Sequence, residues 1–385
     1  MTNKEWSDKR MRPLFIGGYP KSGTTLLLSL LDGHPEVLVF PEETRFFGFL
    51  LPLLRAGASR QAVLEQAFGQ TGVRFFKEGV FDDGAGVRDY SAIDFPRYQD
   101  TVESLWASSG YSHAGLLEAL VNAYAIVTDQ DSTRKRYWVE KSPGNEHCAQ
   151  DILNLFPEAN FIYTLRDPRA NYHSYRKKKR KYLKYDMSVE EFLLAWIKSV
   201  QSMLLGASLC KAGVNQYLVV LYEHLVSNPR GIMESLSKKI DLSWDERLVS
   251  PTRMNLPWEG NSMHGYAFAG VSTEAVEVWK AELELEDRAL IESVLGADVL
   301  AQMKEKAPQI ADTLAARPLG DAGLLFDILT RRRDGLSLRQ KLALVARVSQ
   351  LRSGWLNVRS GISKVMLKNE EADSHEVCHE GSRSR

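Results

Sequence analysis

The chain has 385 residues, of which 44% are hydrophobic and 25% are charged, as in an ordinary globular protein. Its 49 Lys and Arg residues balance its 49 Asp and Glu residues, so it lacks the basic surplus of a general nucleic-acid-binding protein. The three cysteines lie far apart and form no CxxC pair, which argues against a disulfide scaffold or a structural zinc site.

Short hydrophobic runs typical of buried strands alternate with helical patterns along the chain. The expected strands are residues 13–18, 37–40, 137–140, 160–165 and 216–222. The expected helices include residues 24–31, 188–211 and 273–295, with a helical insertion over 45–136 and a long loop over 250–272. This alternation predicts an α/β fold, with a central parallel sheet in a three-layer, P-loop-like arrangement.

The domain boundaries and the location are also predicted from composition. We expect one domain over residues 12–305, then a helical appendage over 306–368 and a disordered tail over 369–385. The most apolar run, residues 46–54, is about half of the roughly 18 residues that a membrane helix needs. Residues 1–12 are charged and show no signal-peptide core. A cytoplasmic location is therefore expected.

Residues 18–25 (GYPKSGTT) follow the first expected strand and open the first expected helix, which is the context of a phosphate-binding loop. Loop N–H groups and the helix N-terminus together form an anion-binding hollow. The spacing resembles a Walker A motif, but Thr24 stands at the lysine position and the lysine, Lys21, lies inside the loop. We find no convincing apolar run that ends in a Mg²⁺-binding aspartate, so metal-free transfer of an anionic group fits better than ATP chemistry. A plain Gly/Ser turn is the alternative without function.

Several segments resemble the PAPS-dependent sulfotransferases. Residues 20–27 (PKSGTTLL) resemble their 5′-phosphosulfate loop, and residues 163–175 (YTLRDPRANYHSY) resemble their 3′-phosphate motif. Residues 32–45, which end in EETR, are similar to the tyrosylprotein sulfotransferase branch, and WVEKSP and LYEHLV match further blocks. The resemblance covers about residues 13–295. It implies PAPS as the donor, PAP as the product and no required metal.

The resemblance also implies which residues hold the donor. The residues at the leaving phosphate would be Lys21, Ser22, Gly23, Thr24 and Thr25. Arg166 and Ser174 would bind the 3′-phosphate, and Tyr222 would contact adenine or that phosphate. Ser262 and Lys280 would close over the nucleotide. Taken alone, the RDPR sequence predicts only a capped helix start with a local Asp–Arg pair.

The catalytic residues are expected in the EETR segment and after a neighbouring strand. By resemblance Glu43 is the general base, with Glu42 as the second candidate. Arg45 would orient Glu43 or stabilise developing charge, and Lys141 would stabilise the transition state. The alternatives are a solvated pair of acids after a proline and a surface lysine.

The expected function is transfer of a sulfuryl group from PAPS to a hydroxyl acceptor: a saccharide, lipid, peptide or small alcohol. The tyrosylprotein branch is Golgi-anchored and contains disulfides, neither of which this sequence indicates, so EETR points to a shared base rather than a shared acceptor. The rival functions are an ATP-dependent P-loop phosphotransferase and a non-catalytic nucleotide- or membrane-binding module.

Two basic runs complete the sequence evidence, at residues 176–181 (RKKKRK) and 331–333. The first predicts a solvated helical face, or else attraction of an acidic acceptor, an anionic membrane or the nucleotide. Besides the acceptor, the other partner considered is a membrane surface, contacted peripherally through such basic helices. No nucleic-acid partner is expected. The sequence leaves the oligomeric state open.

Overall fold

The computed structural model describes residues 11–82, 87–211, 213–254, 256–258, 260 and 270–295. The chain divides into two compact units, each assembled from separate segments. Of the described residues, unit 1 holds those up to Leu165 and those within Leu209–Val220 and His224–Thr273. Unit 2 holds those within Arg166–Ser208 and Leu221–Glu223 and those from Glu274 to Leu295. The expected appendage, tail and boundary at residue 305 lie outside the described residues.

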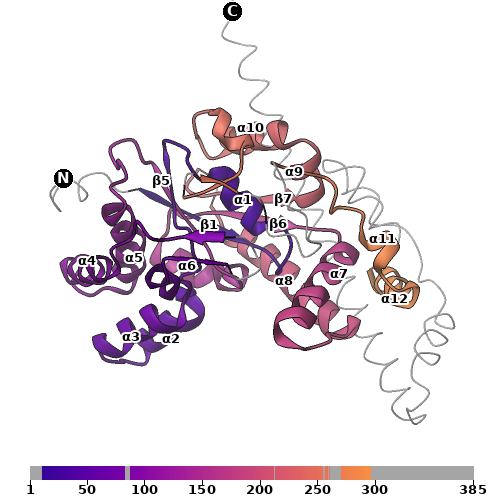
Figure 1. The fold of residues 1–385 in the computed structure, drawn as a ribbon, viewed down its shortest axis with the longest axis horizontal. Helices are drawn as coiled ribbons and strands as arrows, with labels where there is room; N and C mark the ends of the chain where they lie inside the picture. Colours follow the sequence, from indigo (N-terminus) through magenta and orange to yellow (C-terminus); the bar gives the residue numbers. More distant parts are fainter. Residues whose placement is uncertain are drawn as a thin grey trace, which may run out of the picture. The chain divides into compact units, whose positions relative to one another are not determined.

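A five-stranded sheet is the centre of unit 1 (Figure 1), in the order β2-β5-β1-β6-β7. Its strands are β1 (Arg12–Gly17), β2 (Val37–Val39), β5 (Tyr137–Lys141), β6 (Asn160–Leu165) and β7 (Tyr217–Leu221). β1 pairs in parallel with β5 and β6, and β2 pairs in parallel with β5. All five predicted strands are found, and the prediction of an α/β fold with a central parallel sheet is confirmed.

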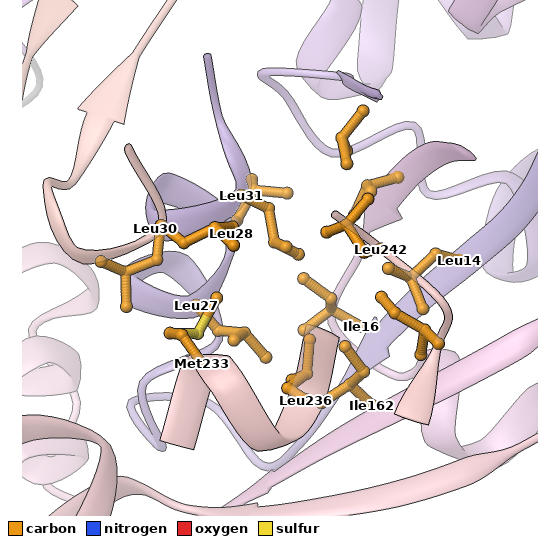
Figure 2. Close-up of a cluster of buried hydrophobic side chains, with 14 of the residues drawn as sticks. Leu14, Ile16, Leu27, Leu28, Leu30, Leu31, Ile162, Met233, Leu236 and Leu242 are labelled. Atoms are coloured by element: carbon orange, nitrogen blue, oxygen red, sulfur yellow. The ribbon is translucent and has the colours of Figure 1, made fainter. Parts of the chain in front are cut away.

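One face of the sheet is covered by an aliphatic core. Leu14 and Ile16 of β1 join a buried cluster with side chains of α1 (Thr24–Leu31) and α10 (Pro229–Lys239), as Figure 2 shows. Helix α1 coincides with the predicted helix because its run of leucines can be buried against the strands. Each fully buried Leu or Ile contributes about 1.5–3 kcal/mol relative to exposure.

The opposite face is covered by aromatic side chains, because successive residues of a strand point to opposite faces. The centroid of the Phe15 ring lies 5.3 Å from that of the Trp138 ring and 5.7 Å from that of the Phe47 ring. It lies 5.9 Å from the ring of Phe156, which follows α6 (Ala149–Leu155). Helical segments therefore cover both faces, as predicted for a three-layer fold.

The region between β2 and β5 is largely helical, as predicted for the insertion. Its helices are η1 (Phe46–Leu50), α2 (Leu51–Arg55), α3 (Arg60–Gln70), η2 (Gly72–Lys77), α4 (Phe95–Ser108) and α5 (His113–Val127). An antiparallel hairpin of β3 (Val80–Asp82) and β4 (Val87–Asp89) interrupts them, which the sequence analysis did not predict. These strands are three residues long, too short for alternation to be recognised.

The other short elements of unit 1 follow the later strands. They are η3 (Asn145–Cys148), α9 (Tyr222–Ser227, which begins in unit 2), η5 (Glu246–Val249), β8 (Thr252–Arg253) and β9 (Leu256–Pro257). β8 and β9 form a hairpin inside the segment expected to be a loop. Tyr222 opens α9 rather than ending the preceding strand as expected.

Unit 2 is mainly helical. Its elements are α7 (Pro168–Lys178), η4 (Lys179–Leu183), α8 (Val189–Leu209), α11 (Trp279–Glu282) and α12 (Leu285–Leu295). By length and composition α8 could cross a membrane, although the sequence analysis found no run of sufficient length. The difference arises because its few charged residues interrupt the apolar run, whereas the mean hydropathy of the whole helix stays high despite them. A buried core helix passes the same test, and α8 buries Phe192, Trp196 and Met203.

Candidate active site

The loop between β1 and α1 is shaped by left-handed backbone. Gly18, Lys21 and Gly23 have φ angles of 145°, 70° and 99°. A Cβ atom on Gly18 would lie 2.6 Å from both the carbonyl and the hydroxyl oxygen of Thr164, so only glycine fits there. The hydroxyls of Ser22 and Thr164 are hydrogen-bonded at 2.8 Å, which ties the loop to β6.

The N-terminus of α1 faces this loop without a side-chain cap. Its N-cap residue is Gly23, which has no side chain to cap the first turn, and that turn begins with Thr24 and Thr25. N–H groups at such a terminus carry partial positive charge and favour an anion. The predicted loop residues are therefore brought together in a backbone arrangement that fits a phosphate or sulfate group.

Glu43 lies between two cations. Its Oε1 accepts a hydrogen bond from the Lys141 ammonium at 2.8 Å, and its Oε2 accepts one from the Arg45 guanidinium at 3.3 Å. Lys141 is the last residue of β5 and pairs with Ile16 of β1, two residues before Gly18. The expected base, its two expected cations and the phosphate loop thus share one edge of the sheet in unit 1.

A buried carboxylate, Glu140, fixes the turn that carries the expected base, Glu43. Its Oε1 accepts bonds from the Thr44 amide and hydroxyl at 3.2 and 2.8 Å and from the Ser142 hydroxyl. Its Oε2 accepts from the Asn145 amide at 2.8 Å, and Asn145 also donates to the carbonyl of Ile16 at 3.3 Å. Burial raises the pKa of Glu140, while these donors oppose the rise. Glu140 therefore links the base segment to the strand that leads into the phosphate loop.

The carboxylate of Glu42 has different hydrogen-bond partners from that of Glu43. Its Oε1 accepts from Arg88 at 2.9 Å, from Arg253 at 2.6 Å and from the buried hydroxyl of Tyr90. Burial and the neighbouring Glu42 charge raise the pKa of Tyr90 far above its ordinary value. These contacts make Glu42 a buried anchor of the insertion, and they favour Glu43 over Glu42 as the base.

Gly72 supports the same segment from the insertion. Its N–H donates to the carbonyl of Glu43 at 2.8 Å. A Cβ on Gly72 would lie 2.7 Å from the Glu43 amide nitrogen, so the two backbones touch directly. Sequence reasoning missed the roles of both residues: Glu140 was quoted only as part of the WVEKSP block and was given no role, and Gly72 was not considered. The only available signal was the position of Glu140 next to Lys141 at a strand end.

In unit 2, Arg166 packs on an aromatic ring. Its guanidinium lies 4.4 Å from the centroid of the Tyr222 ring, and it donates to the carbonyl of Ala275 at 3.3 Å. Burial raises the pKa of Tyr222, and the Arg166 charge opposes that rise. Ser174 is buried on α7. Arg166 and Tyr222, predicted to serve the same nucleotide, are therefore brought into contact.

The remainder of the RDPR sequence has a structural role. The Asp167 carboxylate accepts from the Arg169 backbone amide at 2.9 Å and from its guanidinium at 2.7 and 3.0 Å. Arg169 also lies 4.4 Å from the Trp279 ring and pairs with Glu292 at 2.6 Å. Within this short motif, Asp167 and Arg169 thus form the predicted capped helix start, whereas the expected function belongs to Arg166.

The structure gives little information on the two residues that were expected to close over the nucleotide, Lys280 and Ser262. Lys280 pairs with Glu277 at 2.6 Å on an exposed part of unit 2. Ser262 lies outside the described residues. Their role toward the nucleotide stays a prediction.

Comparison with known proteins identifies the family. Residues 13–246, more than half of the chain, match the model of the sulfotransferase family, so the chain belongs to this family. It is 28% identical to protein-tyrosine sulfotransferase 2 of Gallus gallus over 63% of this chain and 54% of that protein. It is 26% identical to protein-tyrosine sulfotransferase 1 of Danio rerio over 75% of this chain and 72% of that protein. The chain thus spans about half the length of the first of these relatives.

Among solved structures, the sulfotransferase domain of a Synechococcus olefin synthase aligns with a TM-score of 0.43 and 21% identity. The alignment covers 74% of this chain and 96% of that domain. The family resemblance predicted from the motifs is confirmed by the family match and the curated relatives.

Proposed function

We propose that this protein is a sulfotransferase that moves a sulfuryl group from PAPS to a hydroxyl acceptor and releases PAP. The observation that carries the proposal is the position of Glu43, held between Lys141 and Arg45 at the sheet edge where the phosphate loop begins. Membership of the sulfotransferase family supports the same reaction class.

The loop residues fit the phosphosulfate end of the donor. The close approach at Gly18 leaves room for backbone alone, and the uncapped first turn of α1 directs N–H groups into the loop. Lys21 adds a compact positive charge to these donors. We assign the 5′-phosphosulfate to this loop, and the 3′-phosphate to Arg166 and Ser174.

PAPS supplies an activated sulfuryl group, and the chain's own residues handle charge and protons. Glu43 would take the proton of the acceptor hydroxyl as that oxygen attacks sulfur. Lys21 and the loop amides would stabilise the charge that develops on the departing phosphate. Lys141 would stabilise charge on the transferring group and, with Arg45, keeps the Glu43 carboxylate in place.

We propose a tyrosine hydroxyl of a protein as the acceptor to test first, because the curated relatives are named protein-tyrosine sulfotransferases. Saccharides, lipids and small alcohols are the other acceptor classes. The cytoplasmic location expected from composition stays a prediction.

The test is transfer of label from radiolabelled PAPS to a tyrosine-containing peptide, with peptides carrying phenylalanine or serine at that position as controls. We expect label on the tyrosine peptide alone, and at least about 100-fold less transfer by Lys21→Ala. Label on serine instead would reject the acceptor but keep the reaction. Binding of PAP without transfer to any acceptor class would identify a non-catalytic nucleotide-binding module.

A further inference from the structure

An exposed tip joins α7 to α8 in unit 2. Residues 180–186 are all exposed, and three large hydrophobic side chains lie within four positions of this segment. Leu183 is 66% exposed, and Tyr182 and Tyr185 flank it with 39% and 45% exposed. A group of exposed apolar side chains in one turn is typical of an interaction surface.

Lysines are interleaved with these apolar side chains. The ammonium of Lys179 lies 5.3 Å from the centroid of the Tyr185 ring, and that of Lys181 lies 5.1 Å from the Tyr182 ring. Lys184 follows Leu183, and its ammonium donates to the carbonyl of Lys181 at 3.2 Å. We call residues Lys179–Tyr185 the lysine–tyrosine tip.

Three residues of the basic run, Arg176, Lys177 and Arg180, are paired with acids. Arg176 and Arg180 both bind the carboxylate of Asp186, with shortest contacts of 2.6 Å each. Lys177 pairs with Glu282 at 2.7 Å. The charges of these three residues are therefore balanced within the protein, and Lys179, Lys181 and Lys184 supply the positive charge of the lysine–tyrosine tip.

The residues next to the lysine–tyrosine tip are held in place by several contacts. The guanidinium groups of Arg176 and Arg180 both donate to the Asp186 carboxylate, and the buried Tyr172 hydroxyl donates to the carbonyl of Met187 at 3.1 Å. The Tyr172 ring lies 5.2 Å from the ring of Phe192 on α8. Ordering of the tip on binding would therefore cost less conformational entropy than ordering of a free loop.

We propose that the lysine–tyrosine tip binds an anionic membrane surface. Lysine ammonium groups pair with lipid phosphates and carboxylates, while tyrosine rings and a leucine lie among the upper acyl chains. An acidic protein would need the lysines but would gain little from a projecting Leu183, which is why we favour lipid. This inference is independent of the proposed sulfuryl transfer.

The test uses the full chain and two kinds of vesicle, phosphatidylcholine alone and phosphatidylcholine with about one-third phosphatidylserine. We expect binding to the anionic vesicles only, and weaker binding as salt is raised. Replacing Lys179, Lys181 and Lys184 by glutamine should weaken binding about 100-fold, since each basic side chain near such a surface strengthens it several-fold. Leu183→Ser should weaken it about tenfold.

Matched variants elsewhere provide the controls. Leu256→Ser makes the same change at a leucine that is 57% exposed in unit 1. Lys77, Lys198 and Lys238, which are also exposed, can be replaced by glutamine to remove the same charge. Both controls should bind vesicles like the wild type, and thermal unfolding should be unchanged in all four variants.

Three outcomes would overturn the proposal. They are equal losses in the tip and control variants, undiminished vesicle binding by the tip variants, and absence of vesicle binding by the wild type. If the wild type ignores vesicles but binds polyglutamate through the tip lysines, the partner of this surface is an acidic protein.

Discussion

The phosphate loop and the base segment lie at the same edge of the sheet, but they are built in opposite ways. The loop is a backbone structure, in which Gly18 and Gly23 adopt left-handed φ angles and α1 supplies uncapped N–H groups. The base segment is a side-chain structure, in which Glu43 is held by Lys141 and Arg45. Backbone sites depend on a few adjacent residues, whereas side-chain sites depend on distant ones.

Because the loop and the base segment are built differently, mutations in them should have different consequences. A change in the loop should strongly weaken donor binding and leave the base segment intact. A change in the base segment should spare donor binding and lower turnover. The following substitutions test this division in order of expected effect.

Glu43→Gln should have the largest effect on turnover. Removing the proton acceptor while keeping side-chain size should lower kcat about 1,000-fold, with unchanged affinity for PAP. Steady-state kinetics and calorimetric titration with PAP measure the two quantities. Glu42→Gln is the matched control: it disturbs the contacts with Arg88 and Arg253, so it should lower the melting temperature more than Glu43→Gln does. If Glu43→Gln kept its activity, another residue would have to be the general base.

Gly18→Ala should mainly remove donor binding. The added Cβ would sit 2.6 Å from Thr164 oxygens at a φ of 145°, so the loop must move away from β6. We expect about 100-fold weaker binding of PAP, measured by titration. Gly48→Ala, where a Cβ meets nothing within 4 Å, should bind PAP normally. Normal PAP affinity in Gly18→Ala would show that the loop does not hold the donor.

Glu140→Gln should lower kcat without changing donor affinity. The amide would present N–H donors where the carboxylate accepted bonds from Thr44 and Asn145, so the turn that carries Glu43 would shift. A displacement of this kind lowers turnover about 10- to 100-fold. Because Glu140 positions the base without being the base, kcat should fall while the KM for PAPS stays constant. A rise in that KM with constant kcat would contradict this role.

His34 provides the smallest expected effect, on stability rather than turnover. Its Nε2 donates to the carbonyl of Ser243 at 2.9 Å, and its Nδ1 accepts from the amide of Glu36 at 3.1 Å, so the folded protein holds the neutral ring. Burial lowers its pKa below the ordinary value of 6.5. Protons therefore bind the unfolded state better, and the stability from His34 is present above pH 6.5 and is lost as pH falls through the folded-state pKa.

Chemical denaturation of the wild type and His34→Gln at several pH values measures this contribution. We expect the variant to be less stable by about 1 kcal/mol near neutral pH, and the difference to narrow in acid. A difference that is constant or that widens as pH falls would contradict the assignment of the neutral ring.

Local sequence was sufficient for the parts of the molecule that depend on neighbouring residues. α1 and β6 were predicted with their observed limits. Gly23 and Asp32 bound the apolar run of α1, and the polar RDPR sequence directly follows the run of β6. Glu43, Arg45 and Lys141 were proposed by resemblance, and the contacts among them follow from parallel strands that end at one edge of the sheet. Their catalytic roles stay predictions.

Long-range contacts account for what was missed. Glu140 acts on Thr44 and Asn145, and Gly72 contacts Glu43 from the insertion; neither contact has a local signature. The β3–β4 hairpin brings Arg88 and Tyr90 to Glu42, which sequence reasoning could not place. The difference between Glu42 and Glu43, adjacent in the chain, became evident only from these distant partners.

Titration of the purified chain with PAP in the absence of Mg²⁺ tests the central claim most directly, with ATP and Mg²⁺ as the comparison ligand. If the loop around Lys21 is a sulfotransferase donor site, PAP binds tightly without metal, Lys21→Ala weakens it strongly, and ATP with Mg²⁺ binds poorly. Tight binding of ATP that requires Mg²⁺, together with weak binding of PAP, would contradict the account and favour a phosphotransferase.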